Sequence, residues 1–355
     1  MRLAIALGLA AALTVAATAS GHGAAHGAPK GFSPLAAAVV GTRDIWIFGS
    51  YRGCAGPCVA LVRSRDGGRH FKTLAAPPLS GGPTLDFTGP RVGYAFASGS
   101  QLYVTRDGGD TWRSLSPAGV TDVAVGERDV YAVFTKYHRR SETGPVRPPS
   151  ARVERRPVAG GSWHVVKLPV KFRYPISVAA QGRKVWLVGS TQVGAGLVTL
   201  RSTDRGRTFA QGDAFCLHNV PDQGGRLVPA GRRVVWAVCP TGDGNSSSLS
   251  LSTDGGRTFR PFGVTLKSGA EIFPSSADAA VLYRGGSQGP LLRTADLGRH
   301  WADARGTDQL WELFWLRFAT SRAGAALGTT FSHPNRASFW RTTDGGATWH
   351  SLPIR

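Results

Sequence analysis

The chain has 355 residues and carries 42 Lys and Arg against 22 Asp and Glu, a formal net charge of +20 at pH 7. Its length exceeds what a single compact core usually serves, which favours a repeat architecture over one undivided globule. The charge excludes an electrically neutral surface. It indicates anionic partners such as cell-wall polymers or acidic glycans, unless it reflects only an arginine-rich composition and solubility.

The first residues have the features of an export signal. Met1-Arg2 gives a charged start, an apolar Ala/Leu-rich run extends from Leu3 to Ala17, and small residues follow it. This pattern predicts a signal peptide over residues 1–19, because the run is too short and alanine-rich for a membrane anchor. We therefore expect a secreted or extracytoplasmic protein with no transmembrane segment after cleavage. Residues 20–32 are predicted to be a flexible leader.

The dominant pattern in the rest of the chain is a phrase of the form Ser/Thr-x-Asp-x-Gly-x-x-Phe/Trp. Its six copies contain the aspartates Asp66, Asp107, Asp204, Asp254, Asp296 and Asp344. One gap between copies is about twice the others, and Gly160-Gly161-Ser162-Trp163 lies in its middle as a copy without the aspartate. Six intact copies and one decayed copy make seven repeats of roughly 45 residues, a period typical of propeller blades.

A second series of short β-rich runs precedes the phrases. The seven runs are Ile45–Phe48, Gly93–Phe96, Val130–Val133, Val185–Val188, Val234–Val238, Ala280–Tyr283 and Gly324–Leu327. Each repeat then predicts four strands, in the second repeat Thr84–Thr88, Val92–Ala97, Gln101–Arg106 and Thr111–Ser116. The fold class is therefore all-β: a seven-bladed β-propeller of four antiparallel strands per blade over residues 33–355. Six blades with an elaborated loop at the decayed repeat is the alternative.

The phrase resembles the Asp box, or BNR repeat, of sialidases, Ycf48-type photosystem II assembly factors and sortilin-like receptors. The resemblance implies that each phrase is a turn between the third and fourth strands of a blade, on the face away from a ligand. Asp and Ser/Thr side chains bond their own backbone and Gly supplies positive φ, so the aspartates are predicted to form turns and not to catalyse.

Four cysteines fit an oxidising compartment. Three pairings are open from sequence alone. We favour Cys54–Cys58 as a small loop staple and Cys216–Cys239 because the blade phase places both on one face.

The densest basic stretch, from Lys136 to Arg156, contains three prolines and is predicted to be a mobile insertion. It does not interleave aromatic and basic residues as a base-stacking surface does, so no specific nucleic-acid binding is expected. No metal site and no cofactor are predicted, and we expect a monomer.

Ligand-binding candidates are the polar residues predicted at the starts of the inner strands, around the central channel, with Trp311 and Trp315 beside them. These candidates are Asp86, Asp122, Arg173, Tyr174, Asp222, Arg226, Glu271, Glu312 and Arg317. We expect a non-catalytic binding or assembly module for an anionic envelope or extracellular ligand, an anionic glycan or envelope polymer, or a protein partner.

The alternative function is an exo-sialidase-like glycoside hydrolase acting on an acidic sugar. The resemblance implies three arginines that grip a carboxylate and a tyrosine nucleophile paired with a glutamate. Phe172-Arg173-Tyr174-Pro175 is similar to the phrase that holds the first arginine in sialidases, but here it follows the decayed repeat and does not precede the first one. The candidate set is Arg173, Arg226, Arg317 and Glu271. No tyrosine partner for Glu271 is expected, since Tyr283 is predicted on a second strand.

Overall fold

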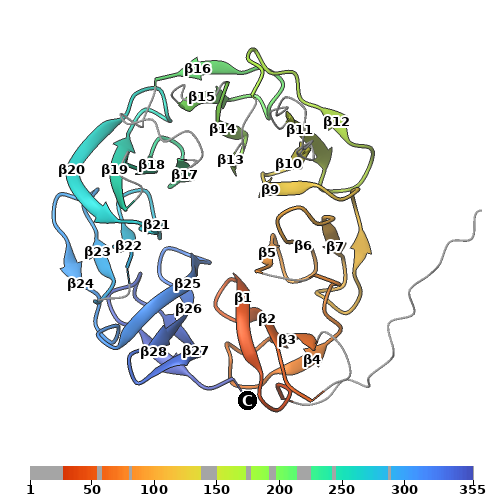
Figure 1. The fold of residues 1–355 in the computed structure, drawn as a ribbon, viewed down its shortest axis with the longest axis vertical. Coiled ribbons are helices and arrows are strands. Elements are labelled where there is room, and N and C mark those ends of the chain that lie inside the picture. The colour runs from red at the N-terminus through yellow and green to blue at the C-terminus, as the bar shows by residue number, and fades with distance from the viewer. Residues whose placement is uncertain are drawn as a thin grey trace, which may run out of the picture.

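The computed structural model describes residues 27–53, 58–79, 82–136, 150–172, 177–191, 197–213, 225–241, 245–286 and 289–354. Within these ranges 28 strands form seven sheets, each of four antiparallel strands in chain order, and there is no helix. The sheets stand around a central axis like blades, with the first and last blades side by side (Figure 1). The seven-bladed propeller predicted from the repeats is confirmed.

Each blade runs from an inner strand at the ring centre to an outer strand at its rim (Figure 1). The inner strands are β1 (Ser33–Val40), β5 (Thr84–Phe87), β9 (Val120–Val125), β13 (Ser177–Gln181), β17 (Arg226–Pro229), β21 (Glu271–Pro274) and β25 (Leu310–Phe318). The second strands are β2 (Asp44–Ser50), β6 (Gly93–Phe96), β10 (Asp129–Lys136), β14 (Lys184–Ser190), β18 (Val235–Pro240), β22 (Ala280–Tyr283) and β26 (Gly324–Thr330). The third strands are β3 (Val59–Ser64), β7 (Tyr103–Thr105), β11 (Ser150–Pro157), β15 (Leu197–Ser202), β19 (Ser246–Ser252), β23 (Leu292–Thr294) and β27 (His333–Thr342). The outer strands are β4 (Lys72–Leu74), β8 (Arg113–Ser114), β12 (His164–Val165), β16 (Ala210–Gly212), β20 (Arg260–Lys267), β24 (Ala302–Asp303) and β28 (His350–Leu352).

The decayed repeat is a complete blade, formed by β9 to β12, and its residues 160–163 lie between the third and fourth strands as predicted. The prediction of a mobile insertion over Lys136 to Arg156 is wrong at its C-terminal end, where β11 begins at Ser150. This blade needs a third strand, and β11 provides it, with the Val153 side chain buried in the core. The proline and arginine content of the segment made a strand look unfavourable in the sequence.

The six aspartate phrases form nearly identical turns. In the fifth blade the Ser252 hydroxyl donates to Asp254 Oδ1 at 2.7 Å and accepts the Gly256 amide at 2.8 Å. The Asp254 carboxylate in turn accepts the backbone amide of Thr258 at 3.1 Å and its hydroxyl at 2.8 Å. Each turn therefore satisfies its own polar groups, which confirms the predicted role of these aspartates as turn formers. We call these six segments the Asp turns.

Asp254→Ala is expected to lower the free energy of unfolding by about 1–2 kcal/mol, because it removes the acceptor for several local donors. Urea denaturation measures this loss. The matched control is Asp303→Ala, an exposed aspartate on the outer strand β24, which should change stability by less than about 0.5 kcal/mol. Equal midpoints for both variants would contradict the assignment.

The Asp turns make stability depend on acid pH. The His70 backbone amide, then its ring, lowers the pKa of Asp66 well below its usual range. The His300 amide and ring lower the pKa of Asp296 to about 2. A carboxylate with a lowered folded-state pKa contributes stability in full above its unfolded pKa, near 4, and loses it as the pH falls through the folded value.

We therefore expect a melting temperature that is nearly constant from pH 7 to 5 and falls between about pH 4 and 2. Calorimetry against pH measures the slope, and Asp254→Asn should make it shallower because one such carboxylate is removed. A melting temperature independent of pH across this window would show that the turns do not bind their carboxylates as described.

Ring closure does not use an exchanged strand in the described part of the chain, where every strand pairs only within its own blade. The first and last blades instead share a hydrophobic cluster that joins Ile47 of β2 to Leu327 of β26 and Phe339 of β27. Arg341 on β27 donates to the carbonyl oxygen of Gly67, in the first Asp turn, and to that of Thr42 at 2.9 Å.

The residues directly before β1 also lie against the first blade. The Gly27 amide donates to Phe71 O at 2.8 Å, and the Thr73 hydroxyl donates to Gly27 O at 2.6 Å. Phe32 packs on the closure cluster. Part of the segment predicted as a leader, residues 27–32, is thus in contact with the propeller.

Cationic side chains link neighbouring blades by donating to backbone carbonyls. Such a link occurs at six of the seven blade interfaces in the described structure. The links are Arg63 to Gly108 O, Arg106 to Val158 O, Arg155 to Arg205 O, Lys184 to Arg232 O, Arg293 to Gly345 O and Arg341 to Gly67 O. Part of the large positive charge is therefore structural, because these cations neutralise the negative ends of turn carbonyls between blades.

Candidate functional site

The charged residues of the inner strands are mostly acidic, although the chain as a whole is strongly basic. The inner strands hold four carboxylates and two guanidinium groups: Asp86, Asp122, Glu271, Glu312, Arg226 and Arg317. All six were predicted as ligand-binding candidates. Most are partnered with other blades.

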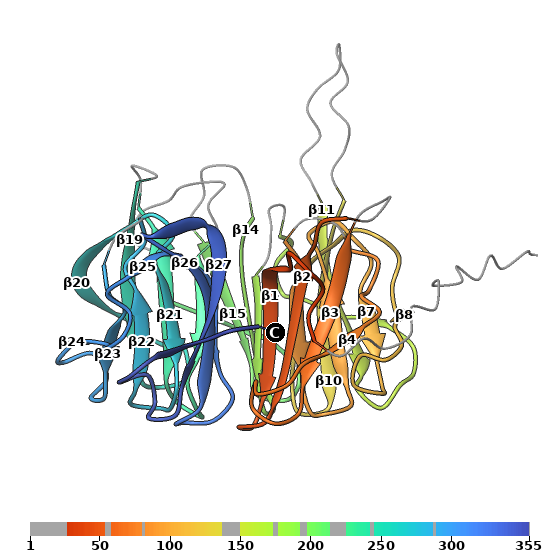
Figure 2. The same ribbon diagram turned by 90° about the horizontal axis from the view of Figure 1, so that it is seen from below.

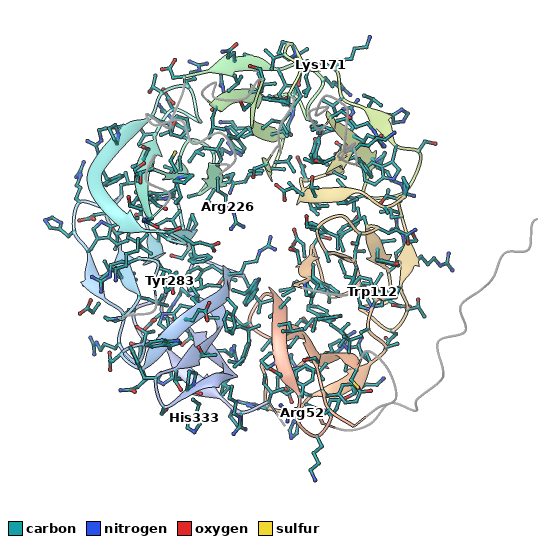
Figure 3. The ribbon with its side chains drawn as sticks, viewed as in Figure 1. Arg52, Trp112, Lys171, Arg226, Tyr283 and His333 are labelled. Carbon is teal, nitrogen blue, oxygen red and sulfur yellow. The ribbon has the colours of Figure 1, made fainter. Side chains whose placement is uncertain are left out.

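Arg226 and Glu271 form an exposed ion pair at the ring centre. They are the first residues of β17 and β21, so the predicted position at the starts of inner strands is confirmed for both. Arg226 Nη1 lies 3.1 Å from Glu271 Oε1, and the two side chains are 63% and 42% exposed. Figure 3 shows Arg226 extending toward the centre of the ring.

Arg317 and Asp86 form a second ion pair, with Arg317 Nη1 2.8 Å from Asp86 Oδ1. Their predicted position at strand starts is wrong: Arg317 is the last residue but one of β25, and Asp86 the last but one of β5. The pair connects the seventh blade to the second across β1, whose middle residues, Ala36 to Ala38, are small. Two bulges lengthen β25 and move Arg317 toward its far end.

Asp122 binds backbone amides of two blades. Its carboxylate accepts the Val123 amide at 2.9 Å and the Val178 amide of β13 at 2.8 Å. Burial raises the pKa of Asp122, while these amides and the charge of Arg226 oppose the rise. The carboxylate thus joins the third blade to the fourth and is occupied by backbone donors.

Tyr283 is closer to Glu271 than the sequence predicted. It lies on the second strand β22, as expected, but it is the cross-strand partner of Glu271 in the register. Its ring is buried and its hydroxyl donates to Gly286 O at 2.9 Å. Burial also raises the pKa of Tyr283, which disfavours the phenolate. The geometry is a tyrosine beside a glutamate, with the tyrosine held in the blade core.

Exposed apolar side chains at the ring centre were not predicted. Leu35 in β1 is 39% exposed and Phe314 in β25 is 45% exposed. Each stands in a register shift of its inner strand, where a bulge leaves one residue out of the pairing. A second bulge in β25 carries Trp311, whose ring meets Phe331 edge-on at 5.0 Å. The sequence feature that could have indicated this exposure is the segment from Leu310 to Phe318, which is rich in large apolar residues.

A pocket of about 400 Å³ lies between β11 and residues 166–172. Its cationic lining residues are Arg152 and Lys171. Arg152 is held by Glu154 at 2.6 Å and by the face of Phe134 at 4.7 Å. Lys171 points outward from the ring (Figure 3), so this pocket is separate from the inner strands.

The remaining candidates lie outside the described residues: Arg173, Tyr174, Asp222, Cys54 and Cys216. Cys58 and Cys239 are described, and neither is a free thiol. Their pairing with Cys54 and Cys216 stays a prediction. The described residues contain no group of three or more side chains placed to hold a metal ion, and none of their elements is a helix able to cross a bilayer.

No family model matches the chain, and no curated protein sequence matches it. Solved structures match its fold. YCF48 bound to D1 peptide matches with a TM-score of 0.53 and 14% identity, over 90% of this chain and 96% of that one. A puromycin hydrolase matches with a TM-score of 0.64 and 14% identity, over 91% of this chain and 54% of that one. An oligogalacturonate lyase in complex with manganese matches with a TM-score of 0.57 and 11% identity, over 85% and 86%. Likeness at these identities shows the propeller fold alone.

Proposed function

We propose that this protein is an exported, non-catalytic binding or assembly module that holds a protein partner at the ring centre. The observation that carries the proposal is how the inner-strand side chains are used. Arg226, Arg317 and Asp122 already bind groups of neighbouring blades, while Leu35 and Phe314 stand exposed. Such a surface offers contact area and not an assembled catalytic set.

A protein partner fits this surface better than an anionic polymer does. The inner strands carry more carboxylates than guanidinium groups, and several arginines elsewhere are held by turn carbonyls. YCF48, which has the same fold, was solved with a peptide bound. That likeness does not choose the partner, but it gives a precedent for peptide binding on this architecture.

The sialidase-like alternative rests on one observation, the placement of Tyr283 opposite Glu271. Against it, the tyrosine is buried with its hydroxyl bound to Gly286 O. Arg226 and Arg317 are each paired with a carboxylate and lie at different heights along their strands. Neither guanidinium is free to grip the carboxylate of an acidic sugar unless its ion pair opens.

The proposal extends to features that stand on sequence: cleavage of residues 1–19, export, Asp-box ancestry of the six turns, a monomeric state, and the pairs Cys54–Cys58 and Cys216–Cys239. Export supplies the oxidising compartment that the two disulfides need. The bond between Cys216 and Cys239 would hold the segment before β17, the strand that begins with Arg226.

The test combines capture with a turnover assay. Photo-crosslinkers placed on the inner strands and, separately, on the Asp turns are used with envelope material from the native host. We expect crosslinkers on the inner strands to give a saturable protein adduct, and crosslinkers on the Asp turns to give none. Release of fluorophore from a sialyl or other glycoside reporter, abolished by Glu271→Gln, would overturn it in favour of a hydrolase.

A further inference from the structure

We propose that β1 and β25 together form a docking site for an extended segment of a partner protein that carries an apolar side chain flanked by lysine or arginine. The inference rests on the proposed binding function and specifies the surface and the chemistry of its partner.

The bulges of the two strands lie at the same height. Leu35 directly precedes Ala36, which pairs with Phe48, and Phe314 directly precedes Trp315, which pairs with Leu327. Phe48 and Leu327 hold equivalent positions in their strands. Ile45 pairs with Ser64 and Gly324 pairs with Thr342, the hydroxyl residues of the two Asp turns. Phe48 lies three residues after Ile45, and Leu327 lies three residues after Gly324. Because β1 and β25 are neighbours in the ring (Figure 1), Leu35 and Phe314 are matched residues of adjacent blades.

Each bulge displaces a large apolar side chain from the blade cores. The described residues include four exposed large hydrophobics, and three of them belong to these two blades: Leu35, Phe314 and Phe331. The fourth is Val165, on the outer strand β12. Ladder pairing would have buried Leu35 and Phe314 against a neighbouring blade, whereas the unpaired bulge position projects them. Exposed apolar side chains gathered on one surface are typical of an interaction site.

On β25 itself, the charged residue nearest to Phe314 in the sequence is acidic. Glu312 is exposed between the two bulges of β25, and the Asp86–Arg317 pair, which is neutral as a pair, lies further along the same strand. A cationic residue of a partner can therefore meet Glu312 while an apolar neighbour contacts Phe314. The +20 charge of the chain does not prevent this, because solvent ions screen charges beyond about 8 Å at physiological ionic strength.

The exposure of Phe331 and Phe314 leaves this surface accessible. The inner strand β1 runs along the axis of the ring (Figure 2), and β25 is in contact with it. Leu310, the first residue of β25, and Phe331, in the hairpin after β26, lie toward the same end of the blade. An extended chain entering from that end meets Phe331, Trp311 and then Phe314.

The probe for the test is a fluorescein-labelled peptide, acetyl-Lys-Leu-Lys-Phe-Lys-amide, titrated with the full chain by anisotropy. We expect saturable binding that Phe314→Ser and Leu35→Ser each weaken about tenfold, since each loses the burial of one large apolar side chain. Glu312→Gln should weaken binding about two- to fivefold and reduce its salt dependence. Val165→Ser, which removes an exposed apolar residue far from the ring centre, should leave binding unchanged.

Four outcomes overturn the inference. Equal affinity for acetyl-Glu-Leu-Glu-Phe-Glu-amide would remove the charge argument, and equal affinity of Phe314→Ser would remove the apolar one. Self-association in sedimentation, lost in Phe314→Ser, would make a second copy of this chain the occupant. All variants change exposed side chains, and unchanged melting temperatures verify folding. If the crosslinking assay captures a partner that Phe314→Ser still binds, the inference fails while the proposed function stands.

Discussion

Arg341→Ala is expected to lower the free energy of unfolding by about 3 kcal/mol, because two charge-assisted hydrogen bonds between the last and first blades are lost. The guanidinium donates to Gly67 O and Thr42 O. These blades are not connected by the chain at this interface and share no strand in the described structure. Their association therefore depends on side-chain contacts, and urea denaturation should report the loss directly.

Arg293→Ala provides the matched control. Arg293 occupies the same position before its Asp turn and donates to Gly345 O at 3.0 Å between the sixth and seventh blades. The chain itself joins those blades, and one hydrogen bond is lost, so the expected loss is about 1–1.5 kcal/mol. A greater loss for Arg293→Ala than for Arg341→Ala would show that ring closure is no weaker than the other interfaces.

The blade architecture could be predicted from sequence because one local turn repeats. Each Asp turn satisfies itself through side chains within four residues, as Asp66 does with Ser64 and His70. Such turns mark blade boundaries without knowledge of the rest of the fold. Strand positions followed within one or two residues: the second blade, predicted to start at Thr84, does so.

The ring centre could not be predicted equally well, because its geometry depends on strand register. A bulge shifts every later residue of a strand relative to its neighbour, and β25 contains two. Arg317 consequently lies near the far end of its strand, paired with Asp86, although its place in the sequence indicated the near end. The exposure of Leu35 has the same cause, since alternation alone predicts a buried leucine in an alanine-rich strand.

Contacts between blades explain part of the arginine excess. Arginine directly before the turn hydroxyl residue reaches the next blade, as Arg63 and Arg293 do. A guanidinium spans this distance and presents several donors, which suits it to carbonyls at a blade interface. Net charge is therefore weak evidence for an anionic ligand in this chain, since the described inner strands carry four carboxylates and only two guanidinium groups.

Trp186→Phe is expected to lower the free energy of unfolding by about 3 kcal/mol, through lost packing and a lost buried hydrogen bond. The Trp186 indole is fully buried in the fourth blade and donates to Gly255 O, in the Asp turn of the fifth, at 3.0 Å. Phenylalanine leaves that carbonyl without its donor and a small cavity beside it.

Trp236→Phe tests the hydrogen-bond contribution, since it makes the same change in volume one blade further on. Trp236 is equally buried, but within the described structure its Nε1 has no hydrogen-bond partner. The following Asp turn has Leu297, at φ +62°, where the fifth blade has Gly255. Removing an unpaired buried donor offsets part of the packing loss, so we expect Trp236→Phe to lower the free energy of unfolding by about 1 kcal/mol or less. The losses in free energy of unfolding of the two variants, measured by urea denaturation, should differ by about 2 kcal/mol. Equal losses would show that packing alone determines the effect.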